Sequence, residues 1–424
     1  MKYLRQIYYE MKHQKMMTWV SISGTALSIF LVMVFYLLDS IDTVEVAPES
    51  QRSHILIGQN FEVGQADGTA SGSGSLNYKI ATQLYHDLRG VERTAVISQH
   101  LDEKDISFKG GESTTISTRS VDHEFWKIYD FIFIQGKPFN EADVKSGLKK
   151  IIITRSLARK MFGEEEVMGR EVLLGTMPYT VSGIVEDINP ILKTTYANAF
   201  IPFQTEEVDR RGGRFGDWLG NTQVVLLIES GTDFEEIRQQ VKERYDRLQT
   251  EAKKNDQIIT YHGQPYDLKT LSGEVYGNVT PQTGNSYRWY IYAFLILIPA
   301  INLSSMTRSR LRHRVSEIGI YRAFGASRAS ILYQFLTENF IITIFGAVIG
   351  LIICLLFMIS FSHLFFTFGV EADSFARPDF NMLFTWKTFF IALIFSCVLN
   401  LVSAFVPAWQ ASRLNPADAI RKSK

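Results

Sequence analysis

The residues whose type and spacing could support recognition chemistry are arginines that lie between two apolar stretches. Guanidinium groups bind lipid phosphates, nucleic-acid phosphates or the carboxylates of a protein partner. Within residues 308–339 the arginines face a single acid, Glu317, before the next helix begins. They are Arg308, Arg310, Arg312, Arg314, Arg322 and Arg328. Because basic residues collect in cytoplasmic loops between membrane spans, membrane topology explains this bias and nucleic acid is not needed.

The same segment has the pattern of a helix, a stop and a second helix. A narrow apolar stripe on the basic helix consists of Leu311, Val315, Ile318 and Tyr321. Gly325 suits a left-handed helix stop, and Ser327 suits the cap of the following helix. Glu317 and Arg314 are spaced for an ion pair worth a few tenths of a kcal/mol. The residues leave two interpretations open: a helix that binds anionic lipid, or an elbow that docks on a soluble partner.

Motifs for catalysis, phosphate binding or metal binding are missing from the sequence. It contains no Gly-x-x-x-x-Gly-Lys-Ser/Thr loop, no His-Glu-x-x-His motif and no paired cysteines. The external histidines are isolated from one another: His54, His86, His100, His123 and His262. We therefore expect no catalytic residue, no metal and no cofactor on this chain. An enzyme carried by the external domain is the least supported hypothesis.

Four uncharged apolar runs set the architecture: residues 18–38, 289–307, 340–361 and 388–406. Each has roughly the 20 residues that cross about 30 Å of hydrocarbon, whereas a buried core helix rarely avoids charge for so long. The first run is longer than a signal-peptide core and lacks a clear cleavage site, so we expect an uncleaved anchor. No run contains an ionisable residue, which argues against an ion-coupled carrier.

The charges that flank the runs predict the orientation. Basic residues dominate residues 1–17, 308–339 and 407–424, which we place in the cytoplasm. Residues 39–288 and the short loop 362–387 then lie outside. The expected fold class is thus an α-helical membrane protein with four transmembrane helices, with a large α+β extracytoplasmic domain inserted between helices 1 and 2.

The external domain shows mixed helix and strand signals. Helices are expected near 76–88 and 157–162, the latter stopped by Gly163, and strands near 94–98, 151–153, 172–174 and 179–185. A hairpin is expected from 106–108 and 114–118. A βαβ-like pattern over 222–261 indicates a second lobe at about 200–265. Residues 64–75 are rich in Gly and Ser and are expected to be a loop without fixed structure.

Small residues predict where helices come close. Gly346 and Gly350 form a Gly-x-x-x-Gly pattern in the third run. The pattern suits a dimer contact or a contact within the chain, and a chance match is equally consistent with it. The two cysteines, Cys354 and Cys397, fall in predicted spans, so the external domain must fold without disulfides.

Three separated motifs resemble one family. The first is the elbow Glu317-Ile318-Gly319-Ile320-Tyr321-Arg322-Ala323-Phe324-Gly325-Ala326-Ser327. The second is the tail 407–421, with Pro407-Ala408, Asn415-Pro416 and a closing Ala419-Ile420-Arg421, where Ile420 stands in place of the usual leucine. The third is external: 153–163, Gly169-Arg170 and 179–185. In this order they resemble the MacB/FtsX-type ABC transporter permeases with a MacB-like periplasmic core domain.

The resemblance implies an inner-membrane permease subunit that pairs with a second copy or a paralogue above two ABC ATPase subunits. ATP would bind to those partners, and this chain would bind no cofactor. The elbow would be the coupling helix, which implies coupling roles for Arg314, Glu317, Ile318, Gly319, Tyr321, Arg322, Phe324, Gly325, Ala326 and Ser327. Other implied partners are membrane lipids and a periplasmic adaptor with an outer-membrane channel, or a hydrolase.

Two functions remain open on this resemblance. One is export or extraction of a substrate by ATP-driven movement of the external domain. The alternative is an FtsX-like regulatory membrane protein that activates a cell-wall hydrolase or a signalling partner without transport. The residues do not identify a substrate.

Overall fold

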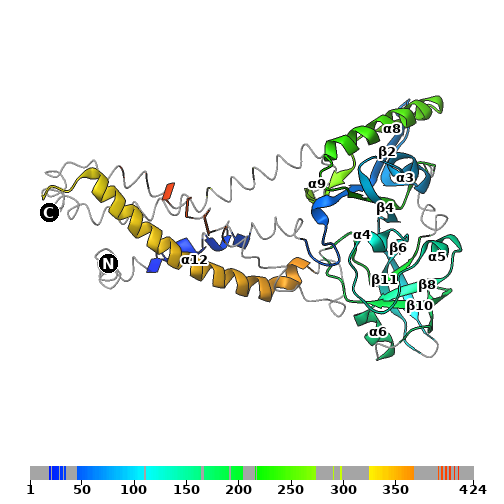
Figure 1. The fold of residues 1–424 in the computed structure, drawn as a ribbon, viewed down its shortest axis with the longest axis horizontal. Coiled ribbons are helices and arrows are strands. Elements are labelled where there is room, and N and C mark those ends of the chain that lie inside the picture. Colours follow the sequence, from blue (N-terminus) through cyan, green and yellow to red (C-terminus); the bar gives the residue numbers. More distant parts are fainter. Residues whose placement is uncertain are drawn as a thin grey trace. The chain divides into compact units, whose positions relative to one another are not determined.

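The computed structural model divides the chain into two units. It describes residues 45–108, 111–163, 167–190, 192–203, 215, 217–273 and 324–366, with short pieces at 19–34 and single or paired residues at 290, 297 and 390–409. One unit comprises Asp42–Asn285 and His363–Asp379. The other comprises Met1–Ile41, Ser286–Ser362 and Phe380–Lys424. The first contains the strands and short helices in Figure 1, and the second contains the long helix α12.

The first unit has two lobes, each with its own hydrophobic core. The terminal lobe is built from both ends of the domain. Its elements are η1 (Arg52–His54), β1 (Ile55–Gly58), β2 (Asn60–Gln65), β3 (Ser71–Leu76), α3 (Tyr78–Tyr85), β4 (Val91–Ser98), β12 (Leu219–Gly220), β13 (Thr222–Ile228), α8 (Phe234–Lys254), β14 (Gln257–Thr260), β15 (Tyr266–Asp267) and α9 (Leu268–Gly273). Helix α8 buries Ile237, Val241 and Tyr245 at helical spacing against this core.

The middle lobe is built from the chain between β4 and β12. Its elements are β5 (Asp102–Ser107), β6 (Thr114–Val121), α4 (Phe125–Ile128), β7 (Phe133–Gly136), α5 (Glu141–Lys145), β8 (Lys150–Thr154), α6 (Arg155–Phe162), β9 (Glu171–Leu174), β10 (Met177–Val185) and β11 (Ala199–Pro202). Strand β8 is buried along its three isoleucines and lies parallel to β10. A continuous apolar run of this kind suits a strand covered on both faces.

Most of the predicted elements of the external domain are confirmed. The helix at 76–88 is α3, and the hairpin is β5–β6, with Ile106 opposite Thr114. Helix α6 ends at Gly163, which has the left-handed φ of 68° that a C-terminal glycine permits. The turn between β9 and β10 contains Gly175 with a φ of 61°.

The prediction of an unstructured loop at 64–75 is wrong. Strands β2 and β3 form an antiparallel hairpin in which Phe61 lies opposite Gly74 and Val63 opposite Gly72. Ladder hydrogen bonds come from the backbone, so a Gly/Ser-rich strand pairs when its neighbour supplies the apolar side chains. At Gly72 the absent side chain has a further role, because a Cβ there would lie 2.9 Å from Phe215 Cδ2.

The βαβ-like segment at 222–261 forms β13, α8 and β14, but its two strands do not pair with each other. The sheet runs in the order β11-β8-β10-β9-β5-β6-β4-β13-β3-β2-β14, so β3 and β2 lie between them. All three pairings along this path are antiparallel. The lobe that contains this segment also contains β1 to β4 and α3, which come from the other end of the domain.

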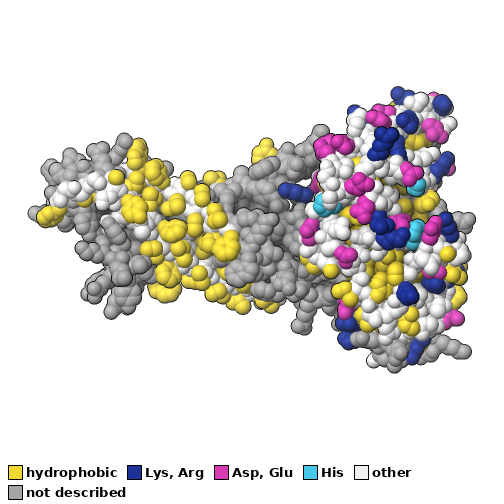
Figure 2. Space-filling view, viewed as in Figure 1, with side chains coloured by type: hydrophobic (Ala, Val, Ile, Leu, Met, Phe, Trp, Pro, Cys, Tyr) yellow, Lys and Arg dark blue, Asp and Glu magenta, His cyan; other side chains and the backbone are white. Residues whose placement is uncertain are grey.

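The second unit contains α12 (Arg328–Phe366) as far as Ser362, and this helix includes the predicted span 340–361. Among the described residues it is the one helix long and apolar enough to cross a membrane, with a mean hydropathy of 3.0 over Phe340–Phe357. Figure 2 shows hydrophobic side chains over much of its visible face. The exposed hydrophobic residues of α12 include Ile344, Val348, Ile352 and Leu356, which recur at helical spacing.

Candidate functional site

The end of the predicted elbow is described from Phe324 to Ser327, where a turn leads into α12. Gly325 has a φ of 92°, as expected of a glycine that stops a helix. The Ser327 hydroxyl oxygen accepts a hydrogen bond from the Ser330 amide at 3.1 Å, as expected of a helix cap. Phe324 is 88% exposed, and Ala326 is half-buried. The turn therefore presents an apolar ring next to a conformationally defined helix start.

The other predicted coupling residues lie outside the described residues. They are Arg314, Glu317, Ile318, Gly319, Tyr321 and Arg322. The structure therefore brings together the last four members of the predicted set.

Gly346 and Gly350 lie on the face of α12 that contacts the N-terminal helical segment. A Cβ at Gly346 would lie 2.7 Å from Thr25 Cγ2, and one at Gly350 would lie 2.7 Å from the Ala26 carbonyl oxygen. The two segments belong to the same unit. Contact this close between a glycine and a neighbouring backbone is typical of helix pairs in membranes.

In the external domain, the strands nearest the two membrane connections pair directly. β1 follows the segment that comes from the first predicted span, and β15 precedes the segment that leads to the second. They are antiparallel, with Leu56 opposite Asp267 and Ile57 opposite Tyr266. Both connections therefore reach the domain at one place, formed by what we call the incoming segment (residues 45–54) and the outgoing strand (β15 with α9).

A buried carboxylate joins the incoming segment to the middle lobe. Glu49 is 1% exposed, and its Oε1 accepts hydrogen bonds from the Thr195 hydroxyl at 2.9 Å and the Thr195 amide at 3.2 Å. Its Oε2 lies 3.1 Å from Nε of Arg52, within the same segment. Burial raises the pKa of Glu49, and the Arg52 charge and the Thr195 hydrogen bonds oppose that shift.

Two further contacts hold the incoming segment to the middle lobe. The Pro48 carbonyl accepts a hydrogen bond from the Asp130 amide at 2.9 Å. The Ser50 hydroxyl donates to the Asp130 carboxylate. Asp130 follows α4, so these contacts and those of Thr195 hold the incoming segment against two separate loops of that lobe.

Arg119 connects the loop that contains Thr195 to the terminal lobe. It is 2% exposed in β6, and its guanidinium donates to the Ser98 carbonyl at 2.7 Å, the Lys193 carbonyl at 2.8 Å and the Tyr196 carbonyl at 3.3 Å. Burial lowers the pKa of Arg119 to about 10, while Tyr129 and Glu49 oppose the shift. Ser98 ends β4 of the terminal lobe, so one side chain bonds to both lobes.

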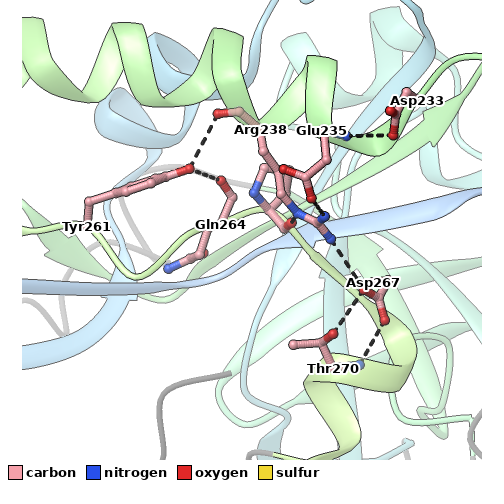
Figure 3. A network of polar contacts seen from close by, with 8 residues as sticks. Asp233, Glu235, Arg238, Tyr261, Gln264, Asp267 and Thr270 are labelled. Atoms are coloured by element: carbon pink, nitrogen blue, oxygen red, sulfur yellow. Dashed lines mark hydrogen bonds and ion pairs between the residues drawn. The ribbon is translucent and has the colours of Figure 1, made fainter. Parts of the chain in front are cut away.

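The outgoing strand is held by α8 (Figure 3). Nη2 of Arg238 lies 3.3 Å from Asp267 Oδ2, and its Nε donates to the Pro265 carbonyl at 3.1 Å. Asp267 also accepts from the amide and the hydroxyl of Thr270, at 2.8 and 2.9 Å. Arg238 lies on α8, where it also pairs with Glu235, so its contact with Asp267 fixes the start of α9 to that helix.

Sequence reasoning did not identify Glu49, Arg119 or Asp267 as functional candidates. Glu49 and Thr195 are 146 residues apart, and no local pattern reports such a contact. Arg119 carries a usable signal, because a lone arginine in the strand Thr114–Val121 demands several hydrogen-bond acceptors if it is buried. Among the described residues, no group of His, Cys, Asp or Glu has the clustering of a metal site.

Comparison with known proteins identifies both parts of the chain. Residues 18–244, more than half of the chain, match the MacB-like periplasmic core domain, and residues 289–416 match the FtsX-like permease C-terminal domain. The periplasmic region of MacB from Actinobacillus actinomycetemcomitans is a similar solved structure, with 15% identity and a TM-score of 0.35. That similarity covers 52% of this chain and 94% of the other.

Two curated relatives illustrate the range of the similarity. "Macrolide export ATP-binding/permease protein MacB 1" of Yersinia pestis bv. Antiqua (strain Antiqua) is 24% identical over 74% of this chain and 44% of its own length. "Uncharacterized ABC transporter permease YknZ" of Bacillus subtilis (strain 168) is 21% identical over 80% of this chain and 79% of its own. The chain thus spans less than half the length of the MacB relative. Both domain matches place it in one family: the chain is a MacB/FtsX-type ABC transporter permease, a membrane protein with a large extracytoplasmic domain.

Proposed function

We propose that this permease couples ATP hydrolysis by a separate ABC ATPase subunit to movement of its extracytoplasmic domain, and thereby exports or extracts a substrate. The proposal includes four membrane spans, cytoplasmic termini, and pairing with a second copy or a paralogue. ATP would bind to the ATPase subunit, and this chain would serve as a non-catalytic membrane subunit. The MacB relative is named for macrolide export and ATP binding; for this chain we leave the substrate general.

The observation that carries the proposal is the exposure of Phe324. The Phe324 ring is 88% exposed, so it leaves an apolar surface open for a partner. Its turn is defined by the left-handed Gly325 and the Ser327 cap, so the ring is presented without a large entropy loss on docking. Rigid aromatic anchors of this kind supply much of the binding energy at protein interfaces.

The test compares Phe324→Ala with Tyr333→Ala in the full-length chain. Tyr333 is 67% exposed on α12, so it controls for loss of an exposed aromatic ring. Each tagged variant would be purified from native membranes in mild detergent, and the ABC ATPase recovered with it would be quantified by mass spectrometry. Loss of an anchor residue weakens the binding free energy by more than about 1.4 kcal/mol, which is a tenfold change in affinity. Phe324→Ala should therefore reduce ATPase recovery about tenfold or more.

Tyr333→Ala should leave recovery close to that of the parent chain. Equal recovery of the ATPase with both variants would show that Phe324 is not an anchor. Absence of any ABC ATPase from the parent preparation would reject the proposed coupling altogether.

A further inference from the structure

We propose that Glu49, Arg52, Arg119 and Thr195 form an interlobe latch, which sets the position of the middle lobe against the terminal lobe and responds to the incoming segment. The inference rests on the proposed function only for the source of the force. These are positioning residues: they transmit a displacement and touch no substrate.

The latch matters because the sheet is narrow where the two lobes meet. β4 of the terminal lobe and β6 of the middle lobe share a single residue pair, Ile97 with Val121. By comparison, β5 and β6 within the middle lobe pair from Asp102 to Ile106. Beside this pair the Asp122 amide donates to the Val96 carbonyl at 3.1 Å, and the Asp122 carboxylate accepts from the Val96 amide at 2.7 Å. So short a junction gives limited resistance to rotation, and contacts elsewhere contribute to the relative position of the lobes.

The incoming segment is connected to both lobes. Its next element, β1, pairs with β13 of the terminal lobe from Ile55 to Gly58. A few residues earlier, Glu49 bonds Thr195 and Ser50 bonds Asp130, both in the middle lobe. A displacement of this segment along its own direction therefore acts across the junction between the lobes.

The outgoing strand has a different set of contacts. Asp267 bonds Arg238 of α8, and β15 pairs with β1, and both partners belong to the terminal lobe. A displacement of the incoming segment relative to the outgoing strand would thus load the Glu49–Thr195 contact first. The two membrane connections differ in which lobe they hold.

The burial of the latch favours two discrete states over gradual loosening. Glu49 and Thr195 are 1% and 0% exposed, and Arg119 is 2% exposed. Loss of one partner would leave a charged or polar group buried without compensation, which is costly. Opening of the latch is therefore coupled to the entry of water, and a modest bias can shift the two populations.

The test measures the distance between spin labels on the two lobes of the full-length chain in lipid nanodiscs. Labels at Lys160→Cys on α6 and Lys242→Cys on α8 report the lobe position by double electron–electron resonance. Both lysines are exposed, and Cys354 and Cys397 would first be replaced by alanine. The comparison is between Thr195→Val, which removes the hydroxyl that donates to Glu49, and the parent.

Thr118→Val is a matched control. The Thr118 hydroxyl is also buried and donates at 2.9 Å, but to the Asp102 carbonyl within the middle lobe. Both variants lose one buried hydroxyl bond of similar length and should lose similar thermal stability. The latch predicts a second distance population, displaced by more than about 2 Å, in Thr195→Val and not in Thr118→Val.

Glu49→Gln gives an independent measurement, since it removes the charge at nearly constant shape. It should also add the second population. Distance distributions of Thr195→Val and Glu49→Gln that both superimpose on that of Thr118→Val would overturn the inference. This outcome is separate from ATPase recovery, which tests the proposed function.

Discussion

Asp122 is a half-buried carboxylate that directly follows β6, beside the Ile97–Val121 pair with β4. Its Oδ2 accepts from the Val96 amide at 2.7 Å, and its Oδ1 accepts from the Phe125 amide at 3.0 Å. Burial raises the pKa of Asp122 from the ordinary 3.8 to about 7, while the backbone hydrogen bonds oppose the shift. The folded protein therefore holds this proton at pH values where the unfolded chain has released it.

The sign of the resulting pH dependence follows from proton binding. Between pH 3.8 and about 7 the folded state binds more protons than the unfolded state, so the unfolding free energy falls as pH rises through this window. The contribution of this one group has a maximum slope of about 1.4 kcal/mol per pH unit. Asp122→Asn should remove that slope, measured by thermal unfolding of the purified chain from pH 5 to pH 8.

Asp105→Asn is the control, because Asp105 is exposed on β5 of the same sheet. We expect the parent and Asp105→Asn to lose stability alike as pH rises from 5 to 7, with Asp122→Asn losing less. If the stability of all three proteins changes with pH in the same way, Asp122 has the same pKa in the folded and the unfolded state.

At the residue scale the sequence predicted the local signals and missed the distant pairs. The left-handed conformation of Gly325 and the cap at Ser327 were correctly predicted, because each depends on backbone groups within three residues. The contact between Glu49 and Thr195 depends on how two distant segments fold together. No short-range pattern records it.

The β2–β3 hairpin shows why one element was mispredicted. A segment rich in glycine and serine is expected to be flexible from its composition alone. In the structure, however, the backbone of β3 is held by β2 and by contact with Phe215. Helices such as α3 and α8 were predictable since an amphipathic period reports the buried face directly. A Gly-rich strand carries no such period, and its partner must be known first.

Two glycines of β3 give a direct test of this account. A Cβ at Gly72 would lie 2.9 Å from Phe215 and 3.2 Å from Leu219, whereas nothing lies within 4 Å of one at Gly74. Gly72→Val should therefore destabilise the domain by about 1–3 kcal/mol through overpacking. Gly74→Val places the same side chain two residues away and should be neutral or slightly stabilising, because valine favours strands.

Chemical denaturation of the purified chain, followed by tryptophan fluorescence, measures both variants. Trp218 lies in the same core and stacks on Phe61 with ring centroids 5.7 Å apart, so one of the six tryptophans reports this lobe directly. Equal stability of the two variants would contradict a close fit at Gly72.

At the scale of the whole molecule, the family and the extracytoplasmic domain were predicted from three short motifs. Motifs of this kind did not predict which strands and helices make up each lobe. β1 to β4 join β13, α8 and β14 in one core, although more than a hundred residues separate them along the chain. Local periodicity identifies each helix and strand, but the choice of partner depends on tertiary burial.

The orientation of the chain is the last prediction, and it follows from charge bias. Arginines cluster from Arg308 to Arg328, the first residue of α12, whereas the domain that contains α8 follows the first predicted span. Lys242→Cys on α8 and Ala329→Cys at the start of α12 both create exposed thiols in a chain with Cys354 and Cys397 replaced. A membrane-impermeant maleimide should label Lys242→Cys in intact cells stripped of their wall, and should label Ala329→Cys only after lysis. Labelling of Ala329→Cys from outside would place the elbow on the wrong side for an ATPase and would reject both the orientation and the coupling role of Phe324.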